Sequence, residues 1–205
     1  MVGIADIRLR LAVAAVFGIW FWIIFFGCDY AARSFEYRHS VATWLDAAIP
    51  FLPQFAIVYM GVNIMLFLPL FVIRDTARVL ALAVTMAAEV AVAGVIYMVY
   101  PVEAAVTPQY SGSAMLGMAD TVNLTYNCFP SLHVALTVST VWAMSPDLRP
   151  LPRALMWIAT AMIAISTVLT KQHFVADAIS GLLLAAIAMA FLFQPLVRKA
   201  ASRFR

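Results

Sequence analysis

The chain has 205 residues, of which 65% are hydrophobic and only 11% charged, and its mean hydropathy is +0.96. Soluble domains are about half apolar and about one quarter charged, so this composition excludes a fold surrounded by water and predicts an all-α protein embedded in a bilayer. The net charge of +3 comes from basic residues between apolar runs and at the C-terminus, and not from a basic stripe. This distribution excludes nucleic acid as a partner.

Six apolar runs approach the length of about 20 residues that a membrane-spanning helix needs. They cover 9–28, 53–73, 77–100, 131–145, 154–170 and 175–196. The first run is too long and too aromatic for a cleaved signal peptide, so we expect it to remain as the first span. The proline-rich stretch 146–152 predicts a tight turn after the fourth span. We therefore expect one domain, residues 1–205, that forms an integral membrane bundle of six transmembrane helices.

Basic residues indicate how this bundle crosses the membrane. In a six-span arrangement they fall on one side, before the first span, after the second, fourth and sixth: Arg8, Arg10, Arg74, Arg78, Arg149, Arg153, Arg198, Lys199, Arg203 and Arg205. Because cytoplasmic loops carry an excess of Lys and Arg, this side and both termini are predicted to be cytoplasmic. The opposite loops are 29–52, 101–130 and 171–174. Short loops and a compact chain favour a bacterial inner membrane, with these loops in the periplasm.

The loop after the first span mixes basic and aromatic side chains: Arg33, Glu36, Arg38, His39 and Trp44. This mixture predicts a short interfacial helix, and alternatively Arg33 or Arg38 binds a lipid phosphate. Cys28 and Cys128 lie at the same outer face, where a disulfide could persist. Nothing in the sequence shows that the two cysteines are close, so a disulfide stays open.

Two histidines begin apolar runs at the same outer face. His173 precedes Asp177 by four residues, so the two side chains are predicted to lie on one helical face. The carboxylate can accept the Nδ1 proton of the imidazole and leave Nε2 nucleophilic. An ordinary polar pair at the membrane interface is the competing interpretation of this spacing.

His133 follows Pro130 and Ser131 at the start of the fourth run. Proline and serine favour a helix start, and the free amides there favour an anionic phosphate. A protonated His133 could donate its proton to a leaving oxygen. The alternative is a capped helix with an interfacial histidine. Because both motifs face one side of the membrane, the sequence predicts that the two histidines meet.

The two motifs carry a family resemblance. Pro130-Ser131-Leu132-His133 resembles the PSGH-like second motif, and Ser166-Thr167 with His173 and Asp177 resembles the third motif SRxxxxxHxxxD, of the type 2 phosphatidic acid phosphatase superfamily. These proteins are the membrane relatives of vanadium haloperoxidases. The resemblance covers most of the chain, because the family also has six spans with these motifs opening the fourth and sixth helices.

The resemblance implies a metal-independent enzyme of lipid metabolism without a cofactor. His173 would attack the phosphorus of a lipid phosphate and form a phosphohistidine, Asp177 would orient it, and His133 would protonate the leaving group. Ser131 would bind the phosphate, and Lys171 would supply a cation. A lysine that merely extends to the bilayer interface is the alternative for Lys171.

The departures from the family pattern are informative. Leu132 replaces the usual glycine and Thr167 the arginine, and loop 101–130 contains no KxxxxxxRP motif and no lysine or arginine at all. These differences resemble the branch of inositol phosphorylceramide and sphingomyelin synthases. The predicted reaction is hydrolysis of a lipid phosphate, and the alternative is headgroup phosphotransfer between lipids. The sequence does not identify the lipid or the oligomeric state.

Two polar residues lie within the predicted spans. Glu89 and Asn63 are at similar depth in the third and second spans, and we expect a neutral, hydrogen-bonded contact between their helices. The alternative is a proton or substrate path, which would make the protein a non-catalytic lipid transporter.

Overall fold

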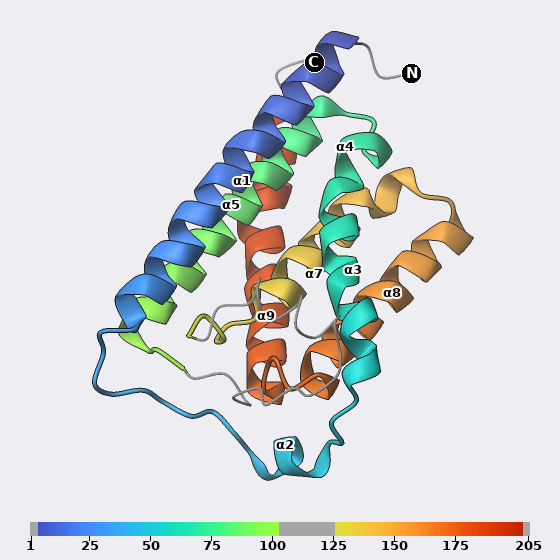
Figure 1. Cartoon of the computed structure of the whole chain (residues 1–205). Helices are drawn as coiled ribbons and strands as arrows, with labels where there is room; N and C mark the ends of the chain where they lie inside the picture. Colours follow the sequence, from blue (N-terminus) through green and yellow to red (C-terminus); the bar gives the residue numbers. More distant parts are fainter. Residues whose placement is uncertain (1–3, 103–125, 203–205) are drawn as a thin grey trace.

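The structure is a computed structural model that describes residues 4–102 and 126–202. Helices and loops make up this part of the chain, which contains no β-strand (Figure 1). The elements are α1 (Ile4–Ala32), α2 (Trp44–Ala48), the 3-10 turn η1 (Pro53–Phe55), α3 (Ala56–Phe67), α4 (Pro69–Val72), α5 (Thr76–Val99), α7 (Leu132–Met144), the 3-10 turn η2 (Ser145–Asp147), α8 (Pro150–Leu169), α9 (Val175–Ala188), the π-helical turn η3 (Met189–Phe193) and α10 (Gln194–Ser202). The predicted all-α class is confirmed.

Five helical segments of the described chain are long and apolar enough to cross a membrane. They are Asp6–Ala32, Pro53–Val72, Thr76–Val99, Pro150–Leu169 and Val175–Ser202. Each coincides with one of the predicted runs, and their length and composition fit an integral membrane protein. The fourth predicted run corresponds to α7, which has 13 residues and is shorter than the roughly 20 residues that a span needs.

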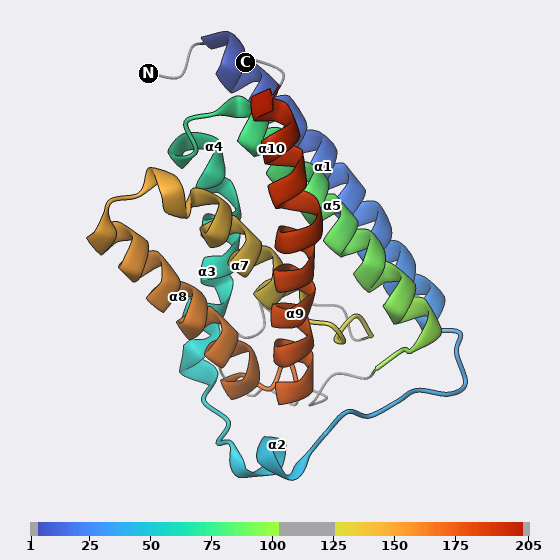
Figure 2. The ribbon, with the colours of Figure 1, turned by 180° about the vertical axis from the view of Figure 1, so that it is seen from behind.

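Helix α7 is the centre of the bundle. Eleven of its thirteen residues are buried, and it packs against α3, α5, α8 and α9. Figure 1 shows α1 and α5 side by side along one flank, with α3 and α8 on the other. The start of α1 and the end of α10 lie at one end of the bundle, and α2 lies at the other (Figure 2).

Arg10 fastens the start of α1 to the bundle. Its side chain is only 1% exposed, and its guanidinium donates to the carbonyls of Leu70, Ile73 and Arg74 at 2.9, 2.6 and 3.0 Å. The same group donates to Thr76 Oγ1 at 3.0 and 3.2 Å. These carbonyls lie at the end of α4, where a helix leaves acceptors without an intrahelical partner.

The proline-rich stretch is only partly a turn. Asp147 ends η2, and α8 already begins at Pro150. Prolines are tolerated in the first turn of a helix because the amide they lack would have no partner there. The prediction of a turn across 146–152 is therefore wrong for its second half.

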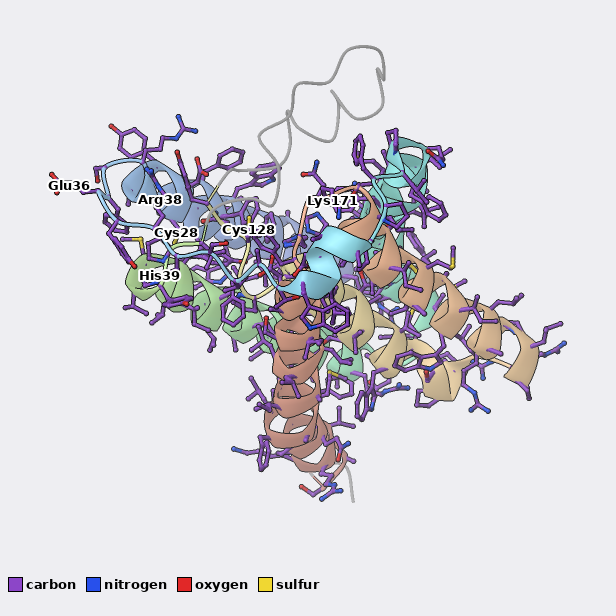
Figure 3. The ribbon with its side chains drawn as sticks, turned by 90° about the horizontal axis from the view of Figure 1, so that it is seen from below. Cys28, Glu36, Arg38, His39, Cys128 and Lys171 are labelled. Carbon is purple, nitrogen blue, oxygen red and sulfur yellow. The ribbon has the colours of Figure 1, made fainter. Side chains whose placement is uncertain are left out.

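The loop after α1 is less helical than predicted. A short helix forms only at Trp44–Ala48, and the chain before it is irregular. Arg33 forms an ion pair with Asp29 at 2.8 Å, and the Arg38 guanidinium lies 4.3 Å from the centre of the Tyr126 ring. Figure 3 shows Arg38 beside the ends of α1 and α5, away from Lys171.

The two cysteines are not bridged. Cys28 and Cys128 are both buried and neither is in a disulfide. The thiol of Cys28 lies 3.5 Å from the carbonyl of Gly94 on α5. The possibility of a disulfide, which the sequence left open, is not realised in this structure.

The polar contact predicted between Glu89 and Asn63 is wrong in its partners. Glu89 of α5 accepts a hydrogen bond of 2.5 Å from Ser139 Oγ of α7, and Asn63 Nδ2 donates to Met60 O of its own helix at 3.1 Å. Both α3 and α5 pack against α7. The sequence predicted a similar depth for Glu89 and Asn63, but α7 supplies the partner of Glu89.

Candidate active site

His173 lies in the turn between α8 and α9, and Asp177 in the first turn of α9. The imidazole Nδ1 is 3.4 Å from Asp177 Oδ2, and the same oxygen accepts the amide of Phe174 at 2.8 Å. Asp177 therefore caps the start of its own helix, where a carboxylate is favoured. His173 precedes the helix, so the expected pair on one helical face forms through this cap instead.

The backbone of His173 is fixed by α8. The amides of Gln172 and His173 donate to the carbonyl of Thr167 at 3.0 and 3.1 Å. The Thr167 side chain is fully buried, and its hydroxyl donates to Ala164 O at 2.7 Å. Thr167 stands at the arginine position of the motif that it resembles, but it acts here through its backbone carbonyl.

His133 lies in the first turn of α7 and meets His173. His133 Nδ1 is 3.3 Å from His173 Nε2, and the two rings meet edge to face with centroids 5.4 Å apart. The structure thus brings together His133, His173 and Asp177, which are separated by up to 44 positions in the sequence.

Tyr59 of α3 is a member of this cluster that the sequence reasoning missed. Its hydroxyl is 2.7 Å from His133 Nε2, and its side chain is 2% exposed. The rings of Tyr59 and His133 lie with centroids 4.5 Å apart. A tyrosine within an apolar span is ordinary, and no spacing relative to a histidine could have selected it from seven tyrosines.

One assignment of donors and acceptors satisfies the hydrogen bonds among Asp177, His173, His133 and Tyr59. An ionised Asp177 can only accept, so His173 Nδ1 carries the hydrogen and Nε2 presents its lone pair. His133 Nδ1 then donates to His173 Nε2, and His133 Nε2 accepts from the Tyr59 hydroxyl. Catalytic hydrogen bonds are often long before substrate binds and shorten afterwards, which fits the distances of 3.3 and 3.4 Å between the ring nitrogens and their partners.

Ser131 is the N-cap residue of α7 and lies beside Asp177. Its amide donates to Asp177 O at 3.0 Å, and its side chain is fully buried. Neither Ser131 Oγ nor Asp177 Oδ1 has a hydrogen-bond partner among the described residues. Buried polar atoms rarely lack a partner, so these two oxygens can serve a ligand or water at the site.

A glycine permits this contact between α7 and α9. A Cβ at Gly181 would collide with the carbonyl oxygen of Ser131 and lie 3.2 Å from Val134 Cβ. On the other side, the Tyr97 hydroxyl donates to Pro130 O at 2.9 Å. The start of α7 is therefore held between α5 and α9.

Lys171 is directed at α2 (Figure 3). Its ammonium donates to the carbonyls of Asp46 and Ile49 at 2.5 and 2.7 Å, and its backbone has a positive φ of 55°. The predicted phosphate cation is thus drawn into a contact that fixes α2 against the turn before α9.

Asp46 completes that contact. Its carboxylate accepts the Val175 amide at 2.8 Å, and the Thr43 amide and hydroxyl at 2.7 Å each. Burial alone raises the pKa of Asp46, but the hydrogen bonds from Val175 and Thr43 outweigh it and lower the pKa below its ordinary value. Asp46 therefore stays ionised at neutral pH.

The cluster combines two roles needed for covalent catalysis. An imidazole oriented by a carboxylate is an activated nucleophile, and a second imidazole within reach can move a proton. In residues 4–102 and 126–202, no group of three or more His, Cys, Asp or Glu side chains is arranged to hold a metal ion.

Comparison with known proteins gives one match. A profile of the PAP2 superfamily matches residues 31–191, a range that includes His133, His173 and Asp177. No curated protein and no solved structure matches the chain. Because the match spans well over half of the 205 residues, the chain belongs to the PAP2 superfamily.

Proposed function

We propose that the protein hydrolyses a membrane lipid phosphate through a phosphohistidine on His173. The observation that carries this proposal is the placement of His173 Nε2 at 3.3 Å from His133 Nδ1, with Asp177 at 3.4 Å from the other ring nitrogen. Membership of the PAP2 superfamily supports phosphatase-type phosphoryl transfer on lipid phosphates.

In the first step, the phosphoryl group of the substrate displaces the hydrogen bond between His133 Nδ1 and His173 Nε2. The freed lone pair of His173 Nε2 then attacks phosphorus, and the bond from phosphorus to the lipid oxygen breaks. His133 enters this step as an imidazolium, which the substrate anion favours. Its Nδ1 proton goes to the departing oxygen, and Tyr59 accepts a hydrogen bond from Nε2. The products are a neutral His133, a free lipid alcohol and phosphorylated His173.

In the second step, water attacks the phosphohistidine. Neutral His133 accepts a proton from the water as the nitrogen–phosphorus bond breaks, and phosphate leaves. Ser131 Oγ and the amides at the start of α7 are placed to stabilise the phosphoryl oxygens. We propose that these groups suffice without a metal ion.

We propose further that α7 is the fourth of six crossings and lies inside the other five. The distribution of basic residues then makes both termini cytoplasmic and puts the histidines on the extracytoplasmic side. The common position of the start of α1 and the end of α10 supports an even number of crossings (Figure 2). A bacterial inner membrane, with the site facing the periplasm, fits this arrangement.

Headgroup transfer to a second lipid is the alternative that one observation favours. Thr167 replaces an arginine and buries its side chain, and loop 101–130 supplies no basic residue. A site with fewer cations suits a phosphodiester, which carries less charge than a monoester. This is the chemistry of the inositol phosphorylceramide synthase-like branch.

One assay separates these reactions. Purified protein is incubated with a panel of lipid phosphates, with and without an acceptor lipid that carries a hydroxyl group. Free phosphate shows hydrolysis, and a new phospholipid shows transfer. Loss of both in the His173→Ala variant is expected. If the protein is instead a lipid transporter, we expect the opposite result: His173→Ala keeps its function, and Glu89→Ala loses it.

A further inference from the structure

A small cavity opens directly beside His133. It has a volume of about 100 Å³ and lies between α1, α3 and α7. Phe25 and Trp22 of α1, Asn63 and Leu66 of α3, and Leu136 of α7 line it together with His133. The imidazole of His133 therefore faces an apolar space inside the bundle.

A second cavity continues the first. It has about 220 Å³, and it shares Phe21, Trp22, Asn63 and Leu66 with the cavity at His133. It extends along α1 as far as Val13. The two cavities together, called the α1–α3 groove, therefore run along α1 from Phe25 to Val13, a separation of twelve residues. Twelve residues of helix span about 18 Å, compared with about 15 Å for half of a hydrocarbon core.

Asn63 is the polar residue of this groove nearest to the histidines along α3. Its side chain is exposed, and its Nδ2 donates one hydrogen bond, to Met60 O. It follows Tyr59 by four residues, about 6 Å along the helix, and Tyr59 touches His133. A polar side chain facing the hydrocarbon region is costly and marks a functional position.

We infer that the α1–α3 groove binds the acyl chain of the lipid phosphate and that Asn63 binds a carbonyl at the head of that chain. This inference rests on the proposed function. In a diacyl or ceramide-type lipid, only the glycerol or sphingoid backbone carbons separate phosphorus from the ester or amide carbonyl. The second N–H of Asn63 can donate to this carbonyl. A polyprenyl phosphate has only hydrocarbon at that place.

The groove, and not the larger hollow on the other side of α7, is the site. An apolar hollow of about 650 Å³ lies between α7, α8 and α9, but neither histidine lines it. The α1–α3 groove is continuous with His133, so a lipid whose phosphate lies at the imidazoles can place its chain there. Asn63 thus selects lipids with a carbonyl linkage.

The first test compares two substrates. Phosphatidic acid and farnesyl phosphate are assayed in the same detergent micelles with the wild type and with Asn63→Leu. We expect KM for phosphatidic acid to rise about two- to thirteen-fold, the range for one lost hydrogen bond, with kcat unchanged and with KM for farnesyl phosphate unchanged. Equal effects on the two substrates, or no effect on either, would overturn the inference.

The second test fills the groove with a matched pair of glycine variants. Gly18 and Gly27 both lie on α1 and both have open space within 4 Å of an added Cβ. Gly18 lines the groove and Gly27 does not. Gly18→Leu should lower kcat/KM for long-chain phosphatidic acid much more than for its dioctanoyl form, and Gly27→Leu should change neither. If Gly18→Leu and Gly27→Leu behaved identically, the inference that the groove binds the acyl chain would be refuted.

A binding measurement separates this inference from the proposed function. Native mass spectrometry of the wild type with phosphatidic acid reports binding whether or not the lipid is hydrolysed. Weaker binding by Asn63→Leu and Gly18→Leu, with no hydrolysis by any form, would keep the groove and refute the phosphatase. Unchanged binding with a changed oligomeric state in Asn63→Leu would assign the groove to a helix of a second copy and refute the inference.

Discussion

The hydroxyl of Tyr59 contacts both ring nitrogens of His133, Nε2 at 2.7 Å and Nδ1 at 3.4 Å. The hydrogen bond of 2.7 Å to His133 Nε2 orients the imidazole, and it lets one hydroxyl donate to the neutral ring or accept from the protonated one. The same hydroxyl lies 3.4 Å from His133 Nδ1, but it takes part in no bond that is made or broken in the two proposed steps, so Tyr59 acts as a positioning residue through His133.

Tyr59→Phe removes this hydroxyl and keeps the ring that packs against His133. We expect kcat to fall about ten-fold, equivalent to about 1.4 kcal/mol, with a small change in KM. The pH dependence of kcat should shift as well, because the groups that face His133 are Tyr59 and His173. Steady-state kinetics across pH measure both effects.

Tyr100→Phe is the matched control. Its ring stacks on His39 with centroids 3.9 Å apart, at the same end of the bundle but apart from the cluster. This variant should leave the pH profile unchanged. If Tyr59→Phe and the control gave the same profile as the wild type, Tyr59 would have no positioning role.

Ser131 offers a test in which activity and stability move in opposite directions. Its buried Oγ has no partner among the described residues, so Ser131→Ala removes an unsatisfied hydroxyl and should stabilise the fold slightly. If this hydroxyl binds a phosphoryl oxygen, the variant should also lose about ten-fold in kcat/KM. Thermal unfolding and steady-state kinetics, measured on one preparation, test both expectations. An unchanged kcat/KM would contradict phosphate binding by Ser131.

The sequence predicted the residues of this cluster that come in motifs. The spacing of His173 and Asp177, and the helix start before His133, are local patterns that carry chemical meaning. Tyr59 depends on the packing of α3 against α7, which no local pattern encodes. The direction of Lys171 depends likewise on α2, a helix of five residues that lies distant in the sequence.

At the scale of elements, the site exists because α7 and α9 approach closely. Asp177 O accepts the Ser131 amide at 3.0 Å, a contact between the starts of two helices. Gly181 lies one turn further along α9, where any side chain would meet the Ser131 carbonyl. The packing of these two helices thus sets the distance between the two imidazoles.

Gly181→Ala should therefore disturb stability and activity together. The added methyl forces α9 away from backbone atoms that cannot move aside, and overpacking of this kind costs about 1–3 kcal/mol. We expect a lower unfolding temperature and a loss of lipid phosphatase activity. Gly27→Ala is the control, since its Cβ meets no atom within 4 Å; equal behaviour of the two variants would show that α9 need not pack this closely.

Element boundaries followed the sequence closely where hydrophobicity set them. The predicted runs 53–73 and 77–100 correspond to the segments Pro53–Val72 and Thr76–Val99. The turn predicted across 146–152 was wrong where α8 begins at Pro150. The prediction for Glu89 was wrong about packing, because Glu89 pairs with Ser139 instead of Asn63. The position of a residue along an apolar run predicts its depth in the bilayer, but it does not identify the helix that packs against that residue.

At the scale of the molecule, the proposed topology places α2 outside the cytoplasm and α10 inside it. Ala48 and Ala201 are exposed residues at these opposite ends, and the native cysteines are buried. We expect Ala48→Cys to react with a membrane-impermeant maleimide in intact cells, and Ala201→Cys only after lysis. Reaction of both in intact cells, or the reverse pattern, would refute this orientation.

The proposed function depends on the covalent step at His173. The most direct measurement is to trap the phosphoenzyme by acid-free denaturation after incubating purified protein with a radiolabelled lipid phosphate in the presence of EDTA. We expect a label that is stable to base and labile to acid on the wild type, and no label on His173→Ala. A label of the same kind on His173→Ala, or lipid phosphate hydrolysis that survives the loss of His173, would contradict it.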